Sequence, residues 1–231
     1  MTKMRLGDVE IDFLGHDGFL IKNGKRIVID PYNINSKIEH ADIILISHDH
    51  SDHCSIKDIQ HLSKSGTIVV GPPHIQSAIA KVENVELHVI EPGDELEFEG
   101  IKIEAVPAYN VNKYRDPVKK IHFHPKSENY VGYVIKMENV IVYHTGDTDV
   151  IPEMHNLTGY GKHGNKFVAL LPVSGTYVMD ADEAAEAASI LKPTVAIPMH
   201  YGAVVGKLED AERFVELCKS KGVNAQILEK I

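Results

Sequence analysis

The sequence has little cysteine, no long hydrophobic run and no basic excess, and each shortage excludes a class of protein. Only two cysteines, Cys54 and Cys218, occur in 231 residues and neither belongs to a C-x-x-C pair, which excludes a disulfide framework. No apolar stretch approaches the roughly 20 residues that a membrane-spanning helix needs. The charged N-terminal residues interrupt any signal-peptide core. We therefore expect a cytoplasmic protein without a membrane segment.

The charge balance is acidic, with 33 acidic and 24 basic residues and a net charge of −9. A face that binds a polyanion usually shows a basic excess. The densest basic segment here is one short loop with Lys113, Arg115, Lys119 and Lys120. It has room for a single phosphate, although an ordinary solvated loop is the simpler interpretation. We expect a small-molecule substrate and no extended surface for binding nucleic acid. The sequence is also compatible with a homo-oligomer.

Apolar and alternating runs predict a strand-rich chain with a few helices. Hydrophobic residues make up 43% of the sequence, enough for a substantial core. Predicted strands in the first half are Val9–Leu14, Phe19–Ile21, Arg26–Asp30, Ile43–Ile46, Thr67–Val70, Val85–Ile90, Glu95–Phe98 and Ile101–Val106. Later strands are Tyr130–Lys136, Val140–Tyr143, Val168–Pro172 and Val195–Pro198. Predicted helices are Ile56–Ser65, Pro72–Lys81, Asp180–Leu191 and Lys207–Lys221, the third opened by a capping box. The fourth is amphipathic, and its predicted apolar stripe comprises Leu208, Ala211, Phe214, Val215 and Cys218.

Pro107–Asn129 is a long polar connection with little predicted structure, and such a loop is usually functional. The two halves of the sequence resemble each other, because a buried strand leads into His48 in one and into Asp147 in the other. We expect one α+β domain over residues 1–231, made of two similar halves at about 1–125 and 126–231. Two mixed sheets would face one another, with helices outside and ligands at the strand ends.

Histidine is abundant, with fourteen residues, and its positions point to a metal site. The segment from Ser47 to His53 reads Ser-His-Asp-His-Ser-Asp-His and directly follows a predicted buried strand. In an extended loop, His48 and His50 lie on one side, while Asp52 and His53 turn toward a second position. Imidazole and carboxylate groups are good ligands for borderline divalent ions such as Zn²⁺. The pattern therefore predicts two adjacent metal positions.

This segment resembles the signature of the metallo-β-lactamase superfamily. Tyr143–Thr148 (Tyr-His-Thr-Gly-Asp-Thr) is similar to the later aspartate motif of the family, and Ile197–Gly202 to its terminal histidine motif. Gly15–Phe19 and Asp30-Pro31 resemble a branch of cytoplasmic metal-dependent hydrolases. That branch is related to L-ascorbate-6-phosphate lactonase and to N-acylphosphatidylethanolamine phospholipase D. The resemblance covers nearly the whole chain and implies a four-layer αβ/βα sandwich.

The resemblance also implies the metal ligands, carried over residue by residue. One metal takes His48 and His50, the other takes Asp52, His53 and His200, and Asp147 bridges them. Zn²⁺ is the expected metal of both positions, and such sites also accept Mn²⁺, Ni²⁺ or Fe²⁺.

One position departs from the family pattern. Most relatives supply a third histidine to the first metal, and the matching residue here is Asn110, whose amide oxygen is a poor zinc ligand. His124 lies in the long loop that begins there and is our candidate replacement. A role in binding substrate phosphate and a plain surface role are the alternatives for His124. His122 is a second, weaker candidate.

Besides Asn110, which could also bind substrate or orient a ligand, three other residues are candidates for these roles. The resemblance places the turn that holds His16 near the pocket, His144 lies three residues before Asp147, and Tyr177 could line the pocket wall. Tyr109 and Tyr201 could also contact substrate, although packing is the simpler role. We expect Cys54 to neighbour the metal site without binding it, and Cys218 to be a core residue. The remaining histidines are expected at the surface or at helix caps: His40, His61, His74, His88, His155 and His163.

The predicted function is hydrolysis. Two adjacent cations would lower the pKa of a bridging water, and the resulting hydroxide would attack a carbonyl carbon or a phosphorus. Asp52 would orient this nucleophile, and His124 is a candidate proton donor. We expect a phosphodiester, a small ester or a lactone as substrate. One alternative is a metal-binding or sensor module without turnover, which the presence of Asn110 in place of a histidine ligand favours. The other is a nuclease, which the net acidity disfavours.

Overall fold

The computed structural model describes residues 4–231 and divides the chain into two compact units. The first unit comprises the chain up to Glu91 together with Leu228–Ile231, and the second comprises Pro92–Ile227. Each unit holds one large mixed sheet, so the α+β class is confirmed. The expected organisation into similar halves stays a prediction. None of the helices in residues 4–231 combines the length and apolar character that crossing a lipid bilayer requires.

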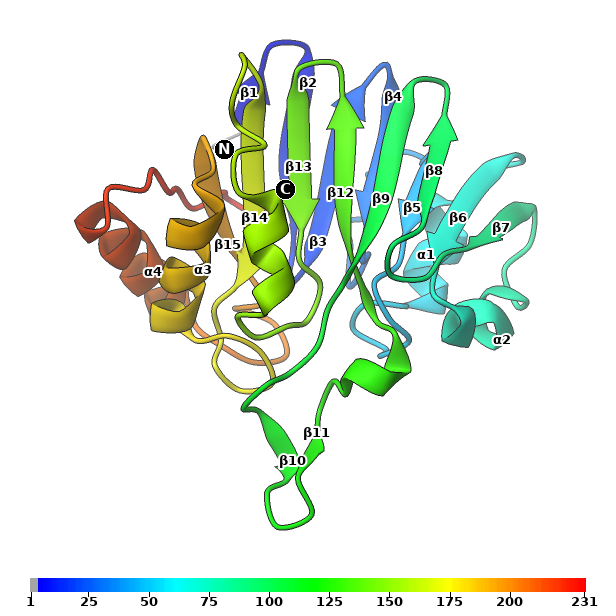
Figure 1. Ribbon diagram of the computed structural model, residues 1–231. Helices are drawn as coiled ribbons and strands as arrows, with labels where there is room; N and C mark the ends of the chain where they lie inside the picture. The colour runs from blue at the N-terminus through cyan, green and yellow to red at the C-terminus, as the bar shows by residue number, and fades with distance from the viewer. Residues whose placement is uncertain (1–3) are drawn as a thin grey trace. The chain divides into compact units, whose positions relative to one another are not determined.

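The first unit is built on a seven-stranded sheet whose spatial order equals its chain order (Figure 1). Its first four strands are joined antiparallel by short turns, and the last four run parallel. The strands are β1 (Met4–Leu6), β2 (Val9–Gly15), β3 (Gly18–Asn23), β4 (Lys25–Ile29), β5 (Ile43–Leu45), β6 (Thr67–Gly71) and β7 (Val85–Val89). The sequence predicted all of these except β1.

Two short helices cover one face of this sheet. They are α1 (Ile56–Leu62) and α2 (Gln76–Ile79), the second preceded by the 3-10 turn η1 (Pro73–Ile75). Ile59, Leu62 and Ile79 join one buried cluster with apolar residues of the sheet such as Ile44 and Val69. Burying a side chain of this size contributes about 1.5–3 kcal/mol. The helices therefore stabilise the sheet that carries the edge loops.

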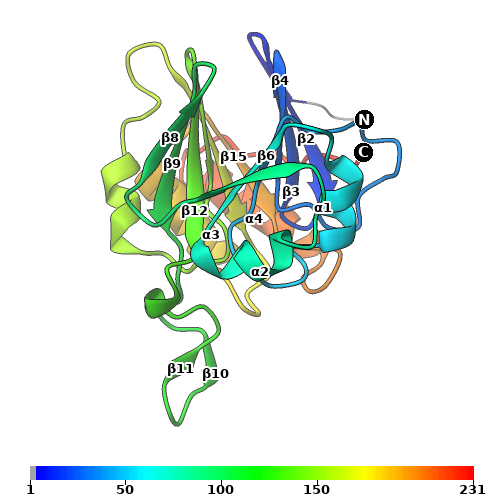
Figure 2. The ribbon, with the colours of Figure 1, turned by 90° about the vertical axis from the view of Figure 1, so that its right-hand side faces the viewer.

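The second unit is built on a six-stranded sheet in the order β15-β14-β13-β12-β9-β8 (Figures 1 and 2). The strands are β8 (Glu95–Phe98), β9 (Ile101–Pro107), β12 (Val131–Met137), β13 (Val140–His144), β14 (Lys166–Pro172) and β15 (Val195–Met199). β13, β14 and β15 run parallel, and the remaining pairs are antiparallel. Buried apolar runs such as Phe167–Leu171 fit strands covered on both faces.

Helices α3 (Ala181–Leu191) and α4 (Leu208–Ser220) pack against each other, α3 on β14 and α4 on β15. The predicted capping box of α3 is confirmed, because the Asp180 side chain accepts from Glu183 N and the Glu183 side chain accepts from Asp180 N. The predicted apolar stripe of α4 is partly wrong. Leu208 sits in the first turn with 52% of its surface exposed. The buried side of α4 is formed by Ala211, Phe214 and Cys218.

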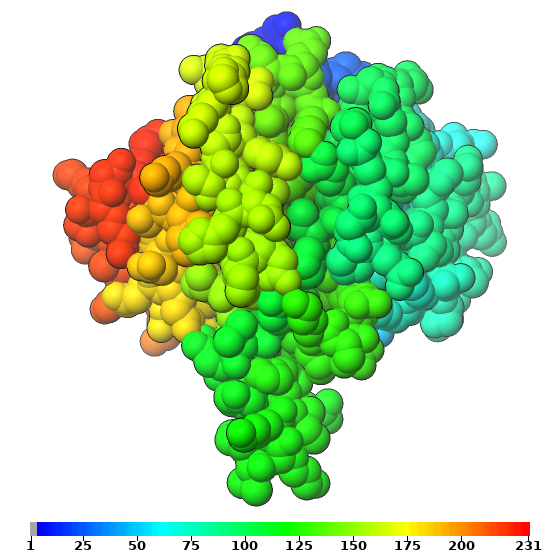
Figure 3. Space-filling view, viewed as in Figure 1, coloured from blue at the N-terminus to red at the C-terminus, as the bar shows by residue number. Residues whose placement is uncertain are grey.

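The connection Pro107–Asn129 has more structure than the sequence indicated. It contains a small two-stranded sheet, β10 (Tyr114–Asp116) with β11 (Ile121–His122), and the 3-10 turn η2 (Lys126–Glu128). This hairpin extends away from the six-stranded sheet and forms a projection in the space-filling view (Figures 1 and 3). Lys113 at its base is bound to Glu183 at 2.6 Å. Lys113, a residue of the short basic loop, therefore already has an acidic partner within its own unit.

Strand direction explains where the candidate ligands lie. In the first sheet β2, β4 and β5 run the same way, so the residues that follow them meet at one edge. These residues are His16, Asp30 and the segment that begins at Ser47. In the second sheet, β9, β13, β14 and β15 run the same way. A polar residue follows each of these strands within three positions, in order Asn110, Asp147, Ser174 and His200. Each unit therefore gathers its polar residues at one edge of its own sheet.

Candidate metal centre

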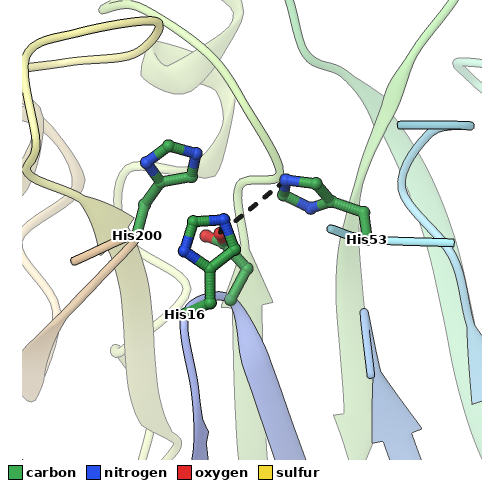
Figure 4. Close-up of side chains that lie close together, drawn as sticks. His16, His53 and His200 are labelled. Atoms are coloured by element: carbon green, nitrogen blue, oxygen red, sulfur yellow. Dashed lines mark ion pairs between the residues drawn. The ribbon is translucent and has the colours of Figure 1, made fainter. Parts of the chain in front are cut away.

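In the first unit, two histidines and two aspartates of the edge loops lie close together. His16 Nε2 lies 3.1 Å from Asp52 Oδ2 and 3.4 Å from Asp17 Oδ2. His53 Nε2 lies 3.8 Å from Asp17 Oδ2 and 3.9 Å from Asp52 Oδ2. Figure 4 shows His16 at the turn after β2 and His53 on the loop after β5. Ligand atoms of His16, Asp17 and His53 lie within 4.8 Å of one another, and such imidazole and carboxylate groups suit a divalent cation.

A buried carboxylate, Asp30, organises the histidine loop. Its Oδ2 accepts hydrogen bonds from His53 Nδ1 at 2.9 Å and from Ser47 Oγ at 2.5 Å, and its Oδ1 accepts from Ser47 N at 2.8 Å. Because the Ser47 hydroxyl proton goes to Asp30, Ser47 Oγ accepts from His48 Nδ1 at 2.9 Å. One carboxylate thus fixes the tautomers of both His48 and His53.

The other predicted ligand of the loop, His50, is exposed and points at its neighbour. His50 Nδ1 lies 3.0 Å from His48 Nε2, and the two rings meet edge to face. That separation fits an N–H···N hydrogen bond, and two ligands of one cation come equally close. His48 is fully buried, so the pair reaches from the interior of the unit to its surface.

In the second unit, two histidines converge on one carboxylate. His124 Nε2 and His200 Nε2 each lie 3.3 Å from Asp147 Oδ2, and all three side chains are buried. His200 follows β15 in the left-handed region at φ 60° (Figure 4). Such backbone strain in a non-glycine residue persists only where the surrounding structure holds it in place. Its Nδ1 is held by Ser174 Oγ at 2.8 Å.

Asn110 holds the other ring nitrogen of His124. Its Oδ1 accepts from His124 N at 2.8 Å and from His124 Nδ1 at 3.2 Å. Asn110 Nδ2 donates to the carbonyl oxygen of Tyr177 at 2.9 Å. The structure therefore places Asn110 behind His124, and the imidazole lies between the amide and Asp147.

The ring orientations show that these residues fit a divalent cation. A neutral histidine that donates from Nδ1 carries a lone pair on Nε2. His53 and His124 both donate from Nδ1, yet the Nε2 of each faces carboxylate oxygens. Two lone pairs repel unless a positive charge compensates them. A bound cation supplies that charge, and histidine ligands of metals are oriented in this way through their second nitrogen.

The remaining predicted residues have other partners. His144 is buried, and its Nδ1 accepts from Gly146 N at 3.2 Å, so this ring shapes the turn before Asp147. The Tyr177 ring packs on Phe123 with ring centroids 4.8 Å apart. Tyr109 and Tyr201 are buried, as expected of packing residues. Exposed surface positions hold His40, His61, His155 and His163, and partly exposed ones hold His74, His88 and His122.

Cys54 is buried beside the histidine loop, and burial raises the pKa of its thiol to about 12. The nearby carboxylates of Asp30 and Asp49 act in the same direction. A thiol of such high pKa stays protonated at neutral pH, and a protonated thiol is a poor metal ligand. This fits the expectation that Cys54 is a neighbour of the ligands.

Several residues of this arrangement were missed in the sequence. Asp17, Ser47 and Ser174 were not singled out, and Asp30 was noted only as part of a family likeness. Asp149 was also missed, although its Oδ2 accepts from Val111 N at 2.6 Å. Asp30 gives a signal only once strands β4 and β5 are known to be parallel neighbours, because their ends then lie side by side.

Comparison with known proteins identifies the family. A model described as a beta-lactamase superfamily domain matches residues 10–200. The chain is 33% identical to a UPF0173 metal-dependent hydrolase of Thermoplasma acidophilum over 93% of both chains. It is 34% identical to one of Thermococcus kodakarensis over 92% of this chain and 93% of that one.

Solved structures show the same fold. A candidate metal-dependent hydrolase from Parabacteroides distasonis is 28% identical and has a TM-score of 0.80, covering 99% of this chain and 98% of that chain. Igni18, a metallo hydrolase from Ignicoccus hospitalis, is 23% identical with a TM-score of 0.73 and covers 96% and 95%. The chain belongs to the beta-lactamase superfamily, among the UPF0173 metal-dependent hydrolases. Its relatives' names and its histidine and aspartate groups support an enzyme that binds divalent metal.

Proposed function

We propose that the chain is a hydrolase that binds two divalent metal ions and cleaves phosphodiesters or small esters and lactones. The observation that carries this proposal is the orientation of the histidines. In each unit, imidazoles held through Nδ1 direct Nε2 at carboxylate oxygens. Family membership supports hydrolysis as the reaction.

The residues that would hold the metals follow the family pattern. His48, His50 and His124 would bind one ion, Asp52, His53 and His200 would bind the other, and Asp147 would bridge them. This donor set of imidazole and carboxylate suits Zn²⁺, and Mn²⁺, Ni²⁺ and Fe²⁺ are the alternatives. We assign His124 to metal binding in preference to proton donation, because in its neutral form its ring proton is on Nδ1, where Asn110 holds it.

Two bound divalent cations would supply Lewis acidity and would lower the pKa of a coordinated water toward neutrality. The chain's own contribution is to orient groups around the reacting centre. Asp52 suits a role in holding the attacking water and accepting its proton, because its side chain is 20% exposed while His16 Nε2 fixes it at 3.1 Å. Phosphodiesters, esters and lactones all develop negative charge on oxygen, which the same cations would stabilise.

The test combines metal analysis with turnover. We expect about two equivalents of metal per chain by inductively coupled plasma mass spectrometry, and hydrolysis of bis-p-nitrophenyl phosphate, p-nitrophenyl acetate or a simple lactone. A chelator should abolish turnover, and added metal should restore it. His48→Ala should lose metal and activity, whereas His155→Ala, at an exposed position, should match the wild type. Two bound metals without turnover on any of the three substrate types would favour a non-catalytic binding module.

A further inference from the structure

We propose that Asn110 is a positioning residue for His124. In this inference, which rests on the proposed function, the pair replaces the third histidine ligand expected in relatives at position 110. His124 binds the metal, and Asn110 sets the orientation and the tautomer of its ring.

The orientation of the Asn110 amide is fixed by its partners. One end faces the carbonyl oxygen of Tyr177 at 2.9 Å, and a carbonyl can only accept, so this end is the NH₂ group. The other end faces His124 N at 2.8 Å, and a backbone N–H can only donate, so this end is the oxygen. Two independent partners therefore agree on the same amide orientation.

That orientation determines the tautomer of His124. The amide oxygen lies 3.2 Å from His124 Nδ1 and can only accept, so Nδ1 carries the proton. In the neutral ring, the lone pair is then on Nε2, which lies 3.3 Å from Asp147 Oδ2. A metal requires a lone pair at that position. Asn110 thus selects the tautomer that binds a metal.

Asn110 has no capacity left to act as a ligand itself. Its oxygen has two lone pairs, and His124 N and Nδ1 use both. Its nitrogen donates to Tyr177 O and lies 3.4 Å from Asp149 Oδ1. The amide is therefore fully engaged in holding its neighbours, and only the histidine is directed at the carboxylate.

The backbone explains how a ligand can come from so far along the chain. Asn110 N donates to His124 O at 2.8 Å, which closes the base of the projecting hairpin β10–β11. Asp149 holds the segment that leads from Asn110 into the hairpin, since its Oδ2 accepts from Val111 N and from Asn112 N at 2.6 and 2.8 Å. The position of the ring is therefore set by hydrogen bonds at the base of the hairpin.

The experiment measures metal affinity and the Co²⁺ absorption spectrum of full-length variants. Asn110→Leu removes the acceptor at similar size, Asn110→Ala removes it with a smaller side chain, and Asn112→Leu is a control two residues away that does not contact His124. We expect Asn110→Leu to weaken one of the two metals by about 10- to 100-fold, the usual effect of losing a group that orients a ligand. Asn110→Ala should show the same loss, whereas Asn112→Leu should retain both metals and the wild-type Co²⁺ spectrum.

A double-mutant cycle separates positioning from general damage. His124→Ala should lower the metal content toward one per chain, and adding Asn110→Leu to it should cause no further loss. Wild-type affinity in Asn110→Leu, or an additional loss in the double variant, would overturn the inference while leaving the hydrolase proposal intact. Absence of metal from the wild type would instead refute the proposed function. If melting of the metal-free protein shows that Asn110→Leu does not fold, a folded Asn110→Ala that keeps both metals with wild-type affinity decides against the inference.

Discussion

The two units hold their histidines by different means. In the first unit, the buried carboxylate of Asp30 fixes His53 directly and His48 through Ser47. In the second, neutral groups do this work separately, because Asn110 holds His124 and Ser174 holds His200. The first arrangement is one charged centre serving two rings, and the second is two neutral partners serving one ring each.

This difference predicts unequal sensitivity to mutation. A hydrogen bond to a charged group contributes about 1.5–3 kcal/mol, against about 0.5–1.5 kcal/mol for a neutral pair. Loss of Asp30 would also release two rings at once, whereas loss of Ser174 would release one. Mutation of the group that holds the histidines should therefore have a large effect in the first unit. In the second unit, mutation of one holding group should affect only the histidine that it contacts.

The largest effect is expected from Asp30→Ala. It removes the acceptor of three hydrogen bonds in a fully buried position, so His48 and His53 lose their fixed tautomers. We expect metal affinity to fall by about 100-fold or more, at the upper end for groups that orient ligands. Isothermal titration with Zn²⁺ measures this change.

The matched control is Asp58→Ala, which removes another buried carboxylate of the same unit. Asp58 accepts from Asn33 N and from Ser55 Oγ, and both partners lie outside the histidine loop. It should lower the melting temperature without a comparable loss of Zn²⁺ affinity. Equal losses of affinity in the two variants would show that Asp30 acts only through general stability.

Ser174→Ala should have a smaller effect. It removes one neutral partner, 2.8 Å from His200 Nδ1, and leaves the rest of the unit in place. We expect metal affinity to fall by about 10-fold, the lower end for such groups. Ser220→Ala, at an exposed hydroxyl that bonds to Leu217 O, should leave affinity unchanged. A loss as large as that of Asp30→Ala would contradict the comparison between the units.

The smallest effect concerns the two thiols, one in each unit. Burial raises the pKa of Cys218 to about 11 and that of Cys54 to about 12, where Asp30 and Asp49 add to burial. Because both are raised above the ordinary value of 9.0, their contribution to stability is full below pH 9 and is lost as the pH rises toward 11 and 12. Neither thiol should react quickly with Ellman's reagent at pH 8 in the native protein, and urea midpoints should fall between pH 9 and 11. Rapid labelling of Cys54 would contradict its burial beside the carboxylates.

The sequence predicted the strands well because their apolar runs are dense. The segment His48–His53 and the capping box at Asp180 were also recognisable, because their residue spacings are local. Asp30 was harder to assign, because its partnership with Ser47 depends on which strands are neighbours. The pairing of Asn110 with His124 depends on the reversal of an intervening hairpin, and no local spacing records it. Leu208 was misassigned because periodicity does not show where a neighbouring element ends.

The last residues of the chain belong to the first unit. Ile231 N donates to Phe13 O, and Lys230 forms a bridge with Phe13 beside strand β2. During synthesis, the ribosome makes residues up to Glu91 early, but these partners are made only after the whole second unit. The emerging first unit must therefore wait for the rest of the chain before this edge of its sheet is closed. Until then, the hydrogen bond from Ile231 N to Phe13 O has not formed.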